Sequence, residues 1–267
     1  MVKEGMPFGR YLVGNSWLHQ RNAASKILAI FLYMIALFVA DNWLMWGLLA
    51  LVCFGMLALG QIPLKSLWHG TKLILILAVI TFVLNLFLYP GEVLWSWGWL
   101  EITREGVFYG SAYALRLLLL IMSAAILTLT TSPIRLTDGL EDLMQPLKKI
   151  KVPVHEIAMM MSIALRFLPT LQEEFQRIQL AQRARGADFG GKGNVFKKMN
   201  RMIPLLIPLF VSSLRWAEEL AQAMEARCYR GGEGRTRWKQ AAWQRQDTLL
   251  LAGSILLFLA VLLERLV

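Results

Sequence analysis

The sequence is short of charge and of cysteine. Charged residues make up 17% of its 267 residues, compared with about 25% in soluble domains, while 57% are hydrophobic and the mean hydropathy is +0.50. So little charge argues against a soluble domain. The two cysteines, Cys53 in an apolar run and Cys228 in a basic region, provide no disulfide framework, which excludes the small secreted domains that depend on one.

Patterns for catalysis, metal binding and nucleotide binding are missing as well. His19, His69 and His155 lie in separate polar segments, without a metal-ligand partner one helical turn away. The segment 186–192 approaches a phosphate-binding loop, but Gly193 replaces the Ser or Thr that would bind magnesium, and a helix end precedes it instead of a strand. We therefore expect no catalytic residue, no metal site and no cofactor in this chain.

Five apolar runs are present, at about 27–40, 43–60, 73–89, 107–131 and 249–263. A helix needs about 20 residues to cross a hydrocarbon core about 30 Å thick, so the first and last runs need flanking residues, local thinning of the bilayer or burial by neighbours to span it. The sequence predicts an all-α membrane protein with about five transmembrane helices. Residues 1–131 hold about four of them, and residues 248–267 hold the last.

Positive residues predict the orientation of the spans, because Lys and Arg are retained on the cytoplasmic side. The formal net charge is +10, and residues 132–247 hold nineteen of the 28 Lys and Arg. The N-terminus and residues 132–247 are then cytoplasmic, and the loop 90–106 lies outside. Trp95, Trp97 and Trp99 in that loop fit an interfacial belt or a partner contact. In a chain this apolar, the positive charge indicates a membrane surface and no nucleic acid.

Residues 132–247 form an amphipathic cytoplasmic region with no run suited to crossing the membrane. Ser132 and Pro133 suit the cap and the first position of a helix. Two longer helices follow, at about 154–185 and 196–228, because their apolar residues recur at alternating steps of four and three. Pro169 is expected to bend the first of them. The region therefore consists mainly of two long amphipathic helices.

The apolar stripes of these two helices predict how they pack. Large residues give way to alanine toward the C-terminal end of each helix, which lets two backbones approach closely. The residues assigned to this packing are Leu168, Leu171 and Phe175 in the first helix, and Phe210, Leu214, Ala217 and Ala221 in the second.

Both long helices finish alike. Ala184-Arg185-Gly186 closes the first and Ala226-Arg227-Cys228 closes the second. Arginine interacts favourably with the C-terminal end of the helix dipole and glycine provides a left-handed stop, so capping alone accounts for a single end of this kind. Two matching ends on consecutive helices favour a shared function.

These ends resemble those of the transmembrane T component (EcfT) of energy-coupling factor (ECF) transporters, the scaffold subunit of a vitamin- and metal-importing branch of ABC transporters. Other matching motifs are Thr130-Thr131-Ser132-Pro133, Gly139-Leu140-Glu141-Asp142-Leu143, Pro146-Leu147-Lys148, Ala164-Leu165-Arg166-Phe167-Leu168-Pro169-Thr170-Leu171 and Ala181-Gln182-Arg183-Ala184-Arg185-Gly186. The resemblance is specific from about 110 to 232. It departs at Cys228, where the family usually has glycine. Near the start of the chain, Gln20-Arg21-Asn22 follows the Leu18-His19 pair, where the family often has Asp-Pro-Arg.

The resemblance implies a non-catalytic, multi-pass subunit of a prokaryotic cell membrane, with two cytoplasmic ABC ATPases and one membrane S component as partners. ATP and magnesium would be bound by the ATPases, and the vitamin or metal-ion substrate by the S component. In the family each motif arginine docks in a groove of one ATPase. This assigns ATPase docking to Arg185 and Arg227, with Ala184, Gly186, Ala226 and Cys228 beside them, and the apolar stripes would hold the S component.

Two other functions are weighed against this one. A conventional ABC importer permease would form its own translocation path, but it usually presents one short coupling helix between spans. A membrane lipid or prenyl transferase should show converging carboxylates, whereas Glu173-Glu174 and Glu218-Glu219 fall mainly on the polar helix faces.

Arg116 lies inside the fourth span, where a charge is costly and a functional role is the default hypothesis. It contacts an S component or another subunit, or it makes a structural pair within the bundle. Gly106, Gly110 and Ala114 precede it at four-residue spacing, which predicts a face for close helix packing.

Overall fold

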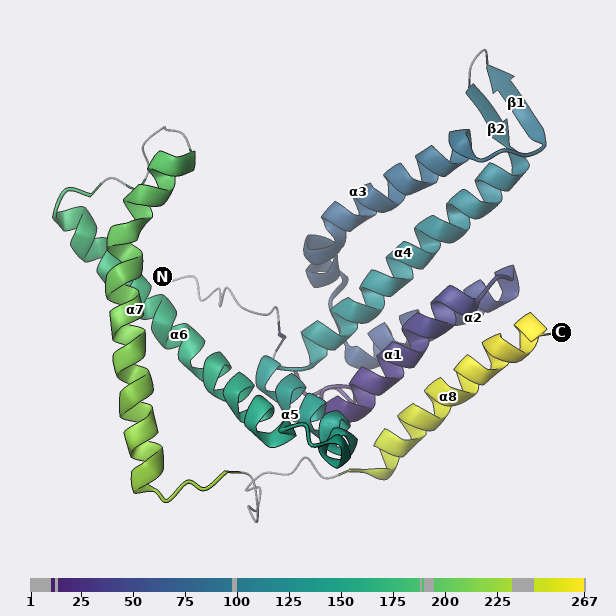
Figure 1. Ribbon diagram of the computed structural model, residues 1–267. Helices are drawn as coiled ribbons and strands as arrows, with labels where there is room; N and C mark the ends of the chain where they lie inside the picture. Colours follow the sequence, from purple (N-terminus) through teal and green to yellow (C-terminus); the bar gives the residue numbers. More distant parts are fainter. Residues whose placement is uncertain are drawn as a thin grey trace. The chain divides into compact units, whose positions relative to one another are not determined.

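The computed structural model describes residues 11–12, 14–97, 100–187, 189, 195–231 and 243–266 (Figure 1). Most of them are helical. The elements are α1 (Ala23–Val39), α2 (Trp43–Gly60), α3 (Leu64–Leu88), β1 (Val93–Trp97), β2 (Leu100–Thr103), α4 (Arg104–Thr130), α5 (Pro133–Met144), the 3-10 helix η1 (Gln145–Ile150), α6 (Val154–Ala184), α7 (Val195–Ala226) and α8 (Arg245–Leu266). Trp99 and the loop residues Gly191, Lys192 and Gly193 lie outside the described residues.

All five apolar runs are helical, which confirms the predicted fold class. By length and composition, the described helices able to cross a membrane are α2, α4, α6 and α8, while α1 and residues 74–88 of α3 are shorter apolar helices. The inclusion of α6 corrects the prediction that residues 132–247 contain no such run. The N-terminal half of α6 carries little charge, from Glu156 and Arg166, among many Ala, Met, Ile and Leu.

The loop predicted between the third and fourth spans contains a β-hairpin. β1 and β2 pair antiparallel, with Val93 opposite Thr103 and Trp97 opposite Leu100. Val, Ile, Thr and Trp are all residues that favour strands, and they dominate both short segments. In Figure 1 the hairpin lies at the end of the pair formed by α3 and α4.

The chain divides into two compact units, Met1–Leu143 with Lys239–Val267, and Met144–Trp238. The first unit includes nearly all of α5, which the sequence assigns to the region beginning at residue 132. The packing of α5 explains the difference. A Cβ added at Gly139 would lie 2.7 Å from Ala23 Cβ and 2.7 Å from the Ala24 nitrogen, so α5 lies directly against the start of α1.

Small residues also bring α3 and α4 close together. A Cβ added at Gly106 would lie 2.9 Å from the carbonyl oxygen of Leu86, and one at Gly110 would lie 3.2 Å from that of Phe82. The close-packing face predicted before Arg116 is therefore used within the chain. Elsewhere in the first unit, α1 packs against α8 and α4, and α2 packs against α4.

A buried polar cluster joins the beginnings of α1 and α8. The Asp247 carboxylate is almost completely buried. It accepts hydrogen bonds from the backbone N–H groups of Asn22 and Gln244, both at 2.9 Å, and from the Ser25 hydroxyl at 3.2 Å. These bonds tie together two helices that come from opposite ends of the sequence.

Lys26 extends this polar cluster to the end of α4. Its buried ammonium group donates to the Thr130 carbonyl (3.2 Å) and to the Thr131 hydroxyl (2.9 Å). The Ser132 hydroxyl accepts from the Arg135 amide at 3.4 Å, so the predicted cap of α5 is present. The corner between α4 and α5 is thus held to the first turn of α1.

The second unit consists of η1, α6 and α7. The predicted bounds of both long helices agree with the structure to within two residues, and α6 continues through Pro169. The two helices contact each other, and the Phe167 and Trp216 rings are stacked with centroids 6.4 Å apart.

Candidate functional site

The end of α6 is a hydrogen-bonded left-handed stop. The Ala187 amide donates to the Gln182 carbonyl, and the Gly186 amide donates to the Arg183 carbonyl, both at 3.0 Å. Gly186 has a φ of +86°, which only glycine adopts without strain. This is the capping geometry that the sequence predicts there.

The end of α7 repeats this geometry. The Tyr229 amide donates to the Met224 carbonyl at 3.0 Å, and the Cys228 amide donates to the Glu225 carbonyl at 2.8 Å. Cys228 takes the left-handed position with a φ of +56°, although it carries a side chain. The similarity of the two ends is therefore one of backbone geometry as well as of sequence.

Both ends present an arginine that is free within the described chain. Arg185 and Arg227 are exposed, and neither guanidinium group has a hydrogen bond or ion pair with any part of the chain that the structure describes. The neighbouring Ala184, Gly186, Ala226 and Cys228 are also exposed. A guanidinium group stays charged at any physiological pH and offers five donors, so each end can bind a carboxylate or carbonyl groups of another protein.

The apolar face of α7 is uncovered. Phe210 is 66% exposed, Ile207 60% and Leu214 55%. Ala217 and Ala221 are exposed too, so they do not form the close crossing with α6 that the sequence predicts. Two helices that cross at an angle touch over only a few turns, and α6 cannot cover a stripe that follows most of α7.

On α6, the predicted packing residues Leu168, Leu171 and Phe175 are half-buried. The ring contact that the structure does show between the helices is made by Phe167 and Trp216. The sequence offers no signal for this contact, because Phe167 lies beside the apolar stripe of α6 whereas Trp216 lies on the other side of α7 from its stripe.

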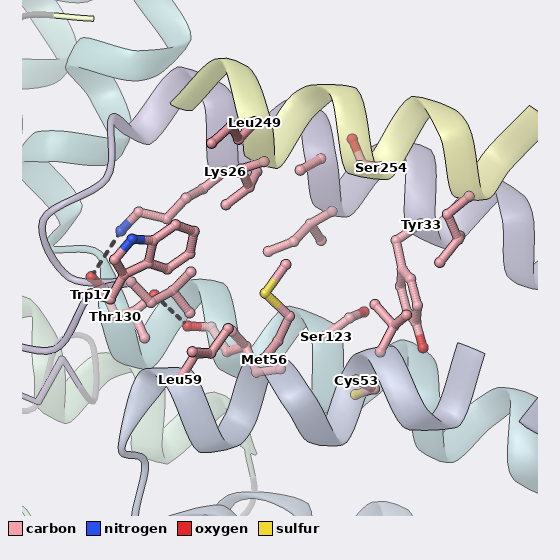
Figure 2. A pocket seen from close by; sticks show the side chains of 18 residues that line it. Trp17, Lys26, Tyr33, Cys53, Met56, Leu59, Ser123, Thr130, Leu249 and Ser254 are labelled. Atoms are coloured by element: carbon pink, nitrogen blue, oxygen red, sulfur yellow. Dashed lines mark hydrogen bonds between the residues drawn. The ribbon is translucent and has the colours of Figure 1, made fainter. Parts of the chain in front are cut away.

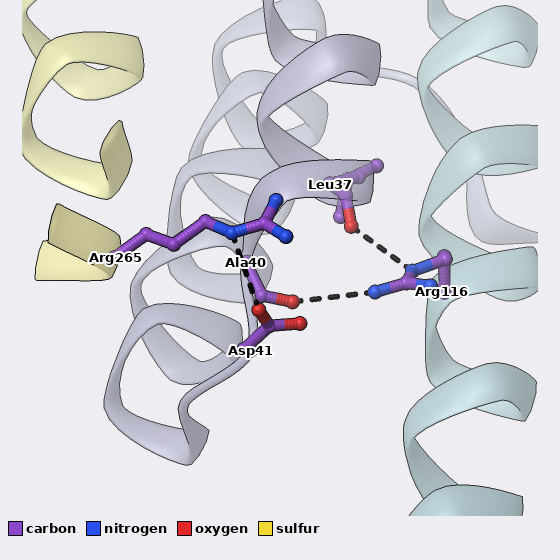
Figure 3. Close-up of polar contacts among 5 residues, drawn as sticks. All are labelled: Leu37, Ala40, Asp41, Arg116 and Arg265. Atoms are coloured by element: carbon purple, nitrogen blue, oxygen red, sulfur yellow. Dashed lines mark hydrogen bonds and ion pairs between the residues drawn. The ribbon is translucent and has the colours of Figure 1, made fainter.

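Arg116 is bound within the first unit (Figure 3). Its Nε donates to the Leu37 carbonyl at 3.0 Å and its Nη2 to the Ala40 carbonyl at 3.2 Å, both at the end of α1. Its guanidinium carbon lies 4.9 Å from the centre of the Trp46 ring. Of the two interpretations of Arg116, the structure supports the one within the bundle, where the cation binds the negative end of the α1 dipole.

No metal centre is seen in the described chain, since none of its His, Cys, Asp and Glu residues gather in groups of three or more that could hold an ion. The buried Asp247 and Lys26 were not predicted as a cluster. Each lies just before an apolar run, and such a position gives no information about which helix it will meet.

Comparison with known proteins gives matches along nearly the whole chain. Residues 14–238 match the family described as CbiQ, cobalt transport protein. A protein of Acidaminococcus fermentans named energy-coupling factor transporter transmembrane protein EcfT is 49% identical over 256 residues, covering 96% of this chain and 94% of that protein. Proteins of the same name from Ruminiclostridium cellulolyticum and Bacillus subtilis are 48% and 42% identical, covering 98% and 96% of this chain and 98% and 97% of their own.

Proposed function

Because this chain belongs to the EcfT family, the transmembrane components of energy-coupling factor transporters, we propose that it is a scaffold that couples two separate ATPases to one S component. The family membership and the apolar helices make it a membrane protein of a bacterial transporter. In our proposal the chain transmits movement and performs no catalysis itself. ATP and magnesium are bound by the ATPases, and the vitamin or metal ion by the S component.

The observation that carries the proposal is the pair of matching ends on α6 and α7. Each end places one exposed arginine, unpaired among the described residues, after a rigid helix and next to small exposed residues. Two equivalent sites suit two equivalent partners. An arginine fork that enters a groove is held by several hydrogen bonds at once, so a movement of the groove is passed to the helix that carries the arginine.

The uncovered face of α7 supports the second half of the proposal. Ile203, Ile207, Phe210 and Leu214 expose a continuous apolar stripe, yet α7 is not among the described helices suited to crossing a membrane. A contiguous exposed apolar patch made by several large side chains is typical of an interaction surface. We assign this face to the S component, whose surface is apolar because it lies in the membrane. Closure of the ATPases on ATP would then shift α6 and α7 and change the contact with the S component.

The test is charge reversal at each arginine in the assembled transporter. We expect Arg185→Glu and Arg227→Glu each to weaken ATPase binding by roughly 30-fold or more, because removing one partner of a buried charge pair costs about 2 kcal/mol or more. Uptake of substrate falls accordingly. Arg177→Glu is the control on α6, since the Arg177 side chain is 80% exposed and its ion pair with Glu174, at 3.5 Å, is of the solvent-screened kind that contributes little.

Copurification from detergent gives the direct measurement. A complex of the chain with two ATPases and a small apolar subunit supports the proposal, and its loss in the two variants but not in the control identifies the docking residues. Unchanged assembly and uptake in both variants would remove the docking assignment. A homodimer of this chain with ATPases would indicate a conventional permease instead.

A further inference from the structure

A cavity of about 340 Å³ lies within the first unit, among α1, α2, α4, α8 and the segment that precedes α1 (Figure 2). Its wall is formed mainly by apolar side chains, including Ile30, Val52, Met56 and Leu257. An engineered apolar cavity of about 150 Å³ stays dry and binds benzene, and by that measure this one has room for roughly a dozen carbon atoms. An apolar ligand of that size fits it.

The cavity follows the helices inward from one end of the bundle. On α1 its lining residues extend from Lys26, in the first turn, to Tyr33, and on α8 from Leu249 to Leu257. On α4 they extend from the last residue, Thr130, back to Ser123. At 1.5 Å per residue each of these distances is about 10–12 Å. The cavity is therefore an elongated space that runs parallel to the helices, from their ends toward the middle of the membrane.

The hydroxyl and ammonium groups in the wall are already bonded within the chain. The Tyr33 hydroxyl donates to the Leu49 carbonyl at 3.0 Å, and the Ser123 and Ser254 hydroxyls donate to carbonyls of their own helices at 2.7 and 2.8 Å. The Lys26 ammonium group is held by Thr130 and Thr131, as described above. These groups are not free for a ligand that needs hydrogen bonds, and the rest of the wall is mainly apolar, so the cavity favours an apolar ligand.

The cavity opens between α2 and α8. Two of its lining residues are largely exposed, Leu59 near the end of α2 (52%) and Leu249 near the start of α8 (69%). Both helices are long and apolar enough to span the membrane, so the medium at this opening is the bilayer. Arg245 is exposed one turn before Leu249 on α8, which places a cation at the level where the lipid phosphates lie.

We propose that this cavity binds one acyl chain of a membrane phospholipid, which enters between α2 and α8 with its headgroup beside Arg245. The depth, direction and polarity of the cavity match a chain that hangs from the interface into the hydrocarbon layer. The bound chain fills space that the helices leave open, and it becomes a structural part of the bundle. This inference rests on the membrane location of the chain and not on its proposed partners.

A larger side chain at Gly253 would fill the cavity. This glycine lines the cavity, and a Cβ added there has no heavy atom within 4 Å, so Gly253→Leu places a side chain where the acyl chain would lie without a clash at its base. Gly55→Leu is the matched control. Gly55 is an exposed helical glycine of α2 whose added Cβ also meets nothing, but it does not line the cavity.

The measurement is electron paramagnetic resonance of phosphatidylglycerol that carries a nitroxide on one acyl chain, with the purified full chain reconstituted in vesicles. We expect about one motionally restricted lipid per chain to be lost in Gly253→Leu and kept in Gly55→Leu. If the Gly253→Leu variant does not fold, Val52→Phe fills the same space from α2. An equal restricted population in wild type, the filled variant and the control would overturn the proposal, and so would a loss of equal size in both glycine variants.

Discussion

The two units of this chain differ in how far their apolar side chains are buried and their polar side chains are bonded within the chain. In the first unit, Leu37, Leu49 and Leu119 are enclosed by helices of the same chain, and the buried polar groups around Asp247 are bonded to one another. In the second unit, the apolar face of α7 is uncovered and the arginines at the helix ends are unpaired among the described residues. The first unit buries apolar and polar groups within the chain, whereas the second leaves exposed the groups that we propose are covered by partner proteins.

The exposed apolar residues of α7 differ from those of the helices suited to crossing a membrane. Those of α2, α4 and α8 in the first unit, and of α6 in the second, lie on helices with the length and composition of membrane spans. α7 does not meet them, since Arg201, Arg215, Glu218 and Glu219 interrupt its sequence. Its apolar face is the surface that our proposal assigns to the S component.

The largest effect is expected when the buried carboxylate of the first unit is removed. Asp247→Ala leaves the Asn22 amide, the Ser25 hydroxyl and the Gln244 amide without their acceptor. We expect the free energy of unfolding to fall by about 3–5 kcal/mol, because breaking a buried charged network leaves uncompensated polar groups. Denaturant titration of the purified chain in detergent micelles measures it.

The control for that variant is the exposed pair at the other end of the bundle (Figure 3). Asp41 lies 3.6 Å from the Arg265 Nε, and the two side chains are 69% and 57% exposed. Asp41→Ala is expected to cost about 0–1 kcal/mol, since solvent screens such pairs. Equal effects of Asp247→Ala and Asp41→Ala would contradict the distinction between a buried network and a surface pair.

A second prediction compares two leucines of α7. Leu205 is almost completely buried and Leu214 is 55% exposed. Leu205→Ala should lower the free energy of unfolding of the isolated chain by about 2–5 kcal/mol through the cavity it leaves. Leu214→Ala should change it by less than about 0.5 kcal/mol.

In the assembled transporter, Leu214→Ala is expected to have a large effect, in contrast to its small effect on the stability of the isolated chain. Leu214→Ala should weaken binding of the apolar membrane partner by roughly tenfold, about 1.4 kcal/mol, because the partner buries this side chain. Copurification yields at a series of detergent concentrations report it. If Leu214→Ala left assembly unchanged while Leu205→Ala destabilised the chain, the apolar face of α7 would not be an interface.

Much of the fold is readable from the sequence because it depends on local patterns. The five apolar runs became helices, Ser132 caps α5, and the two long helices begin and end within two residues of their predicted bounds. Period and capping chemistry act over a few residues, so they are visible in a single sequence. The matching ends of α6 and α7 were predicted for the same reason.

Features that depend on which residues meet across helices were not predicted. The predicted contact between α6 and α7 is present, but Ala217 and Ala221 are exposed, and a ring contact is made by Phe167 and Trp216. The sequence left the role of Arg116 open, because its acceptors are carbonyls of α1, which lies far from it along the chain. Likewise the hairpin of β1 and β2 depends on pairing between two short segments, and neither segment alone specifies its partner.

The last and smallest prediction compares the two helix ends at their left-handed residues, Gly186 and Cys228. Because a residue with a side chain pays roughly 1–2 kcal/mol for a positive φ, Cys228→Gly should stabilise the end of α7. The greater entropy of glycine in the unfolded chain offsets part of this, so we expect a net gain of about 0.5–1 kcal/mol. Gly186→Ala should destabilise the end of α6 by a similar amount, since an added Cβ there has no neighbour within 4 Å and only φ opposes it.

Amide hydrogen exchange in the last turn of each helix measures both effects, because they act on local opening more than on global unfolding. Cys228→Ala separates the contribution of φ from that of the thiol. It keeps a Cβ, so protection of the last turn of α7 should stay at the wild-type level, while Cys228→Gly raises it. If alanine and glycine raised protection equally, the thiol and not the backbone would be the source of strain at Cys228. If glycine alone raises it and ATPase binding is retained, then left-handed backbone geometry is the property that the two ends share, whichever residue supplies it.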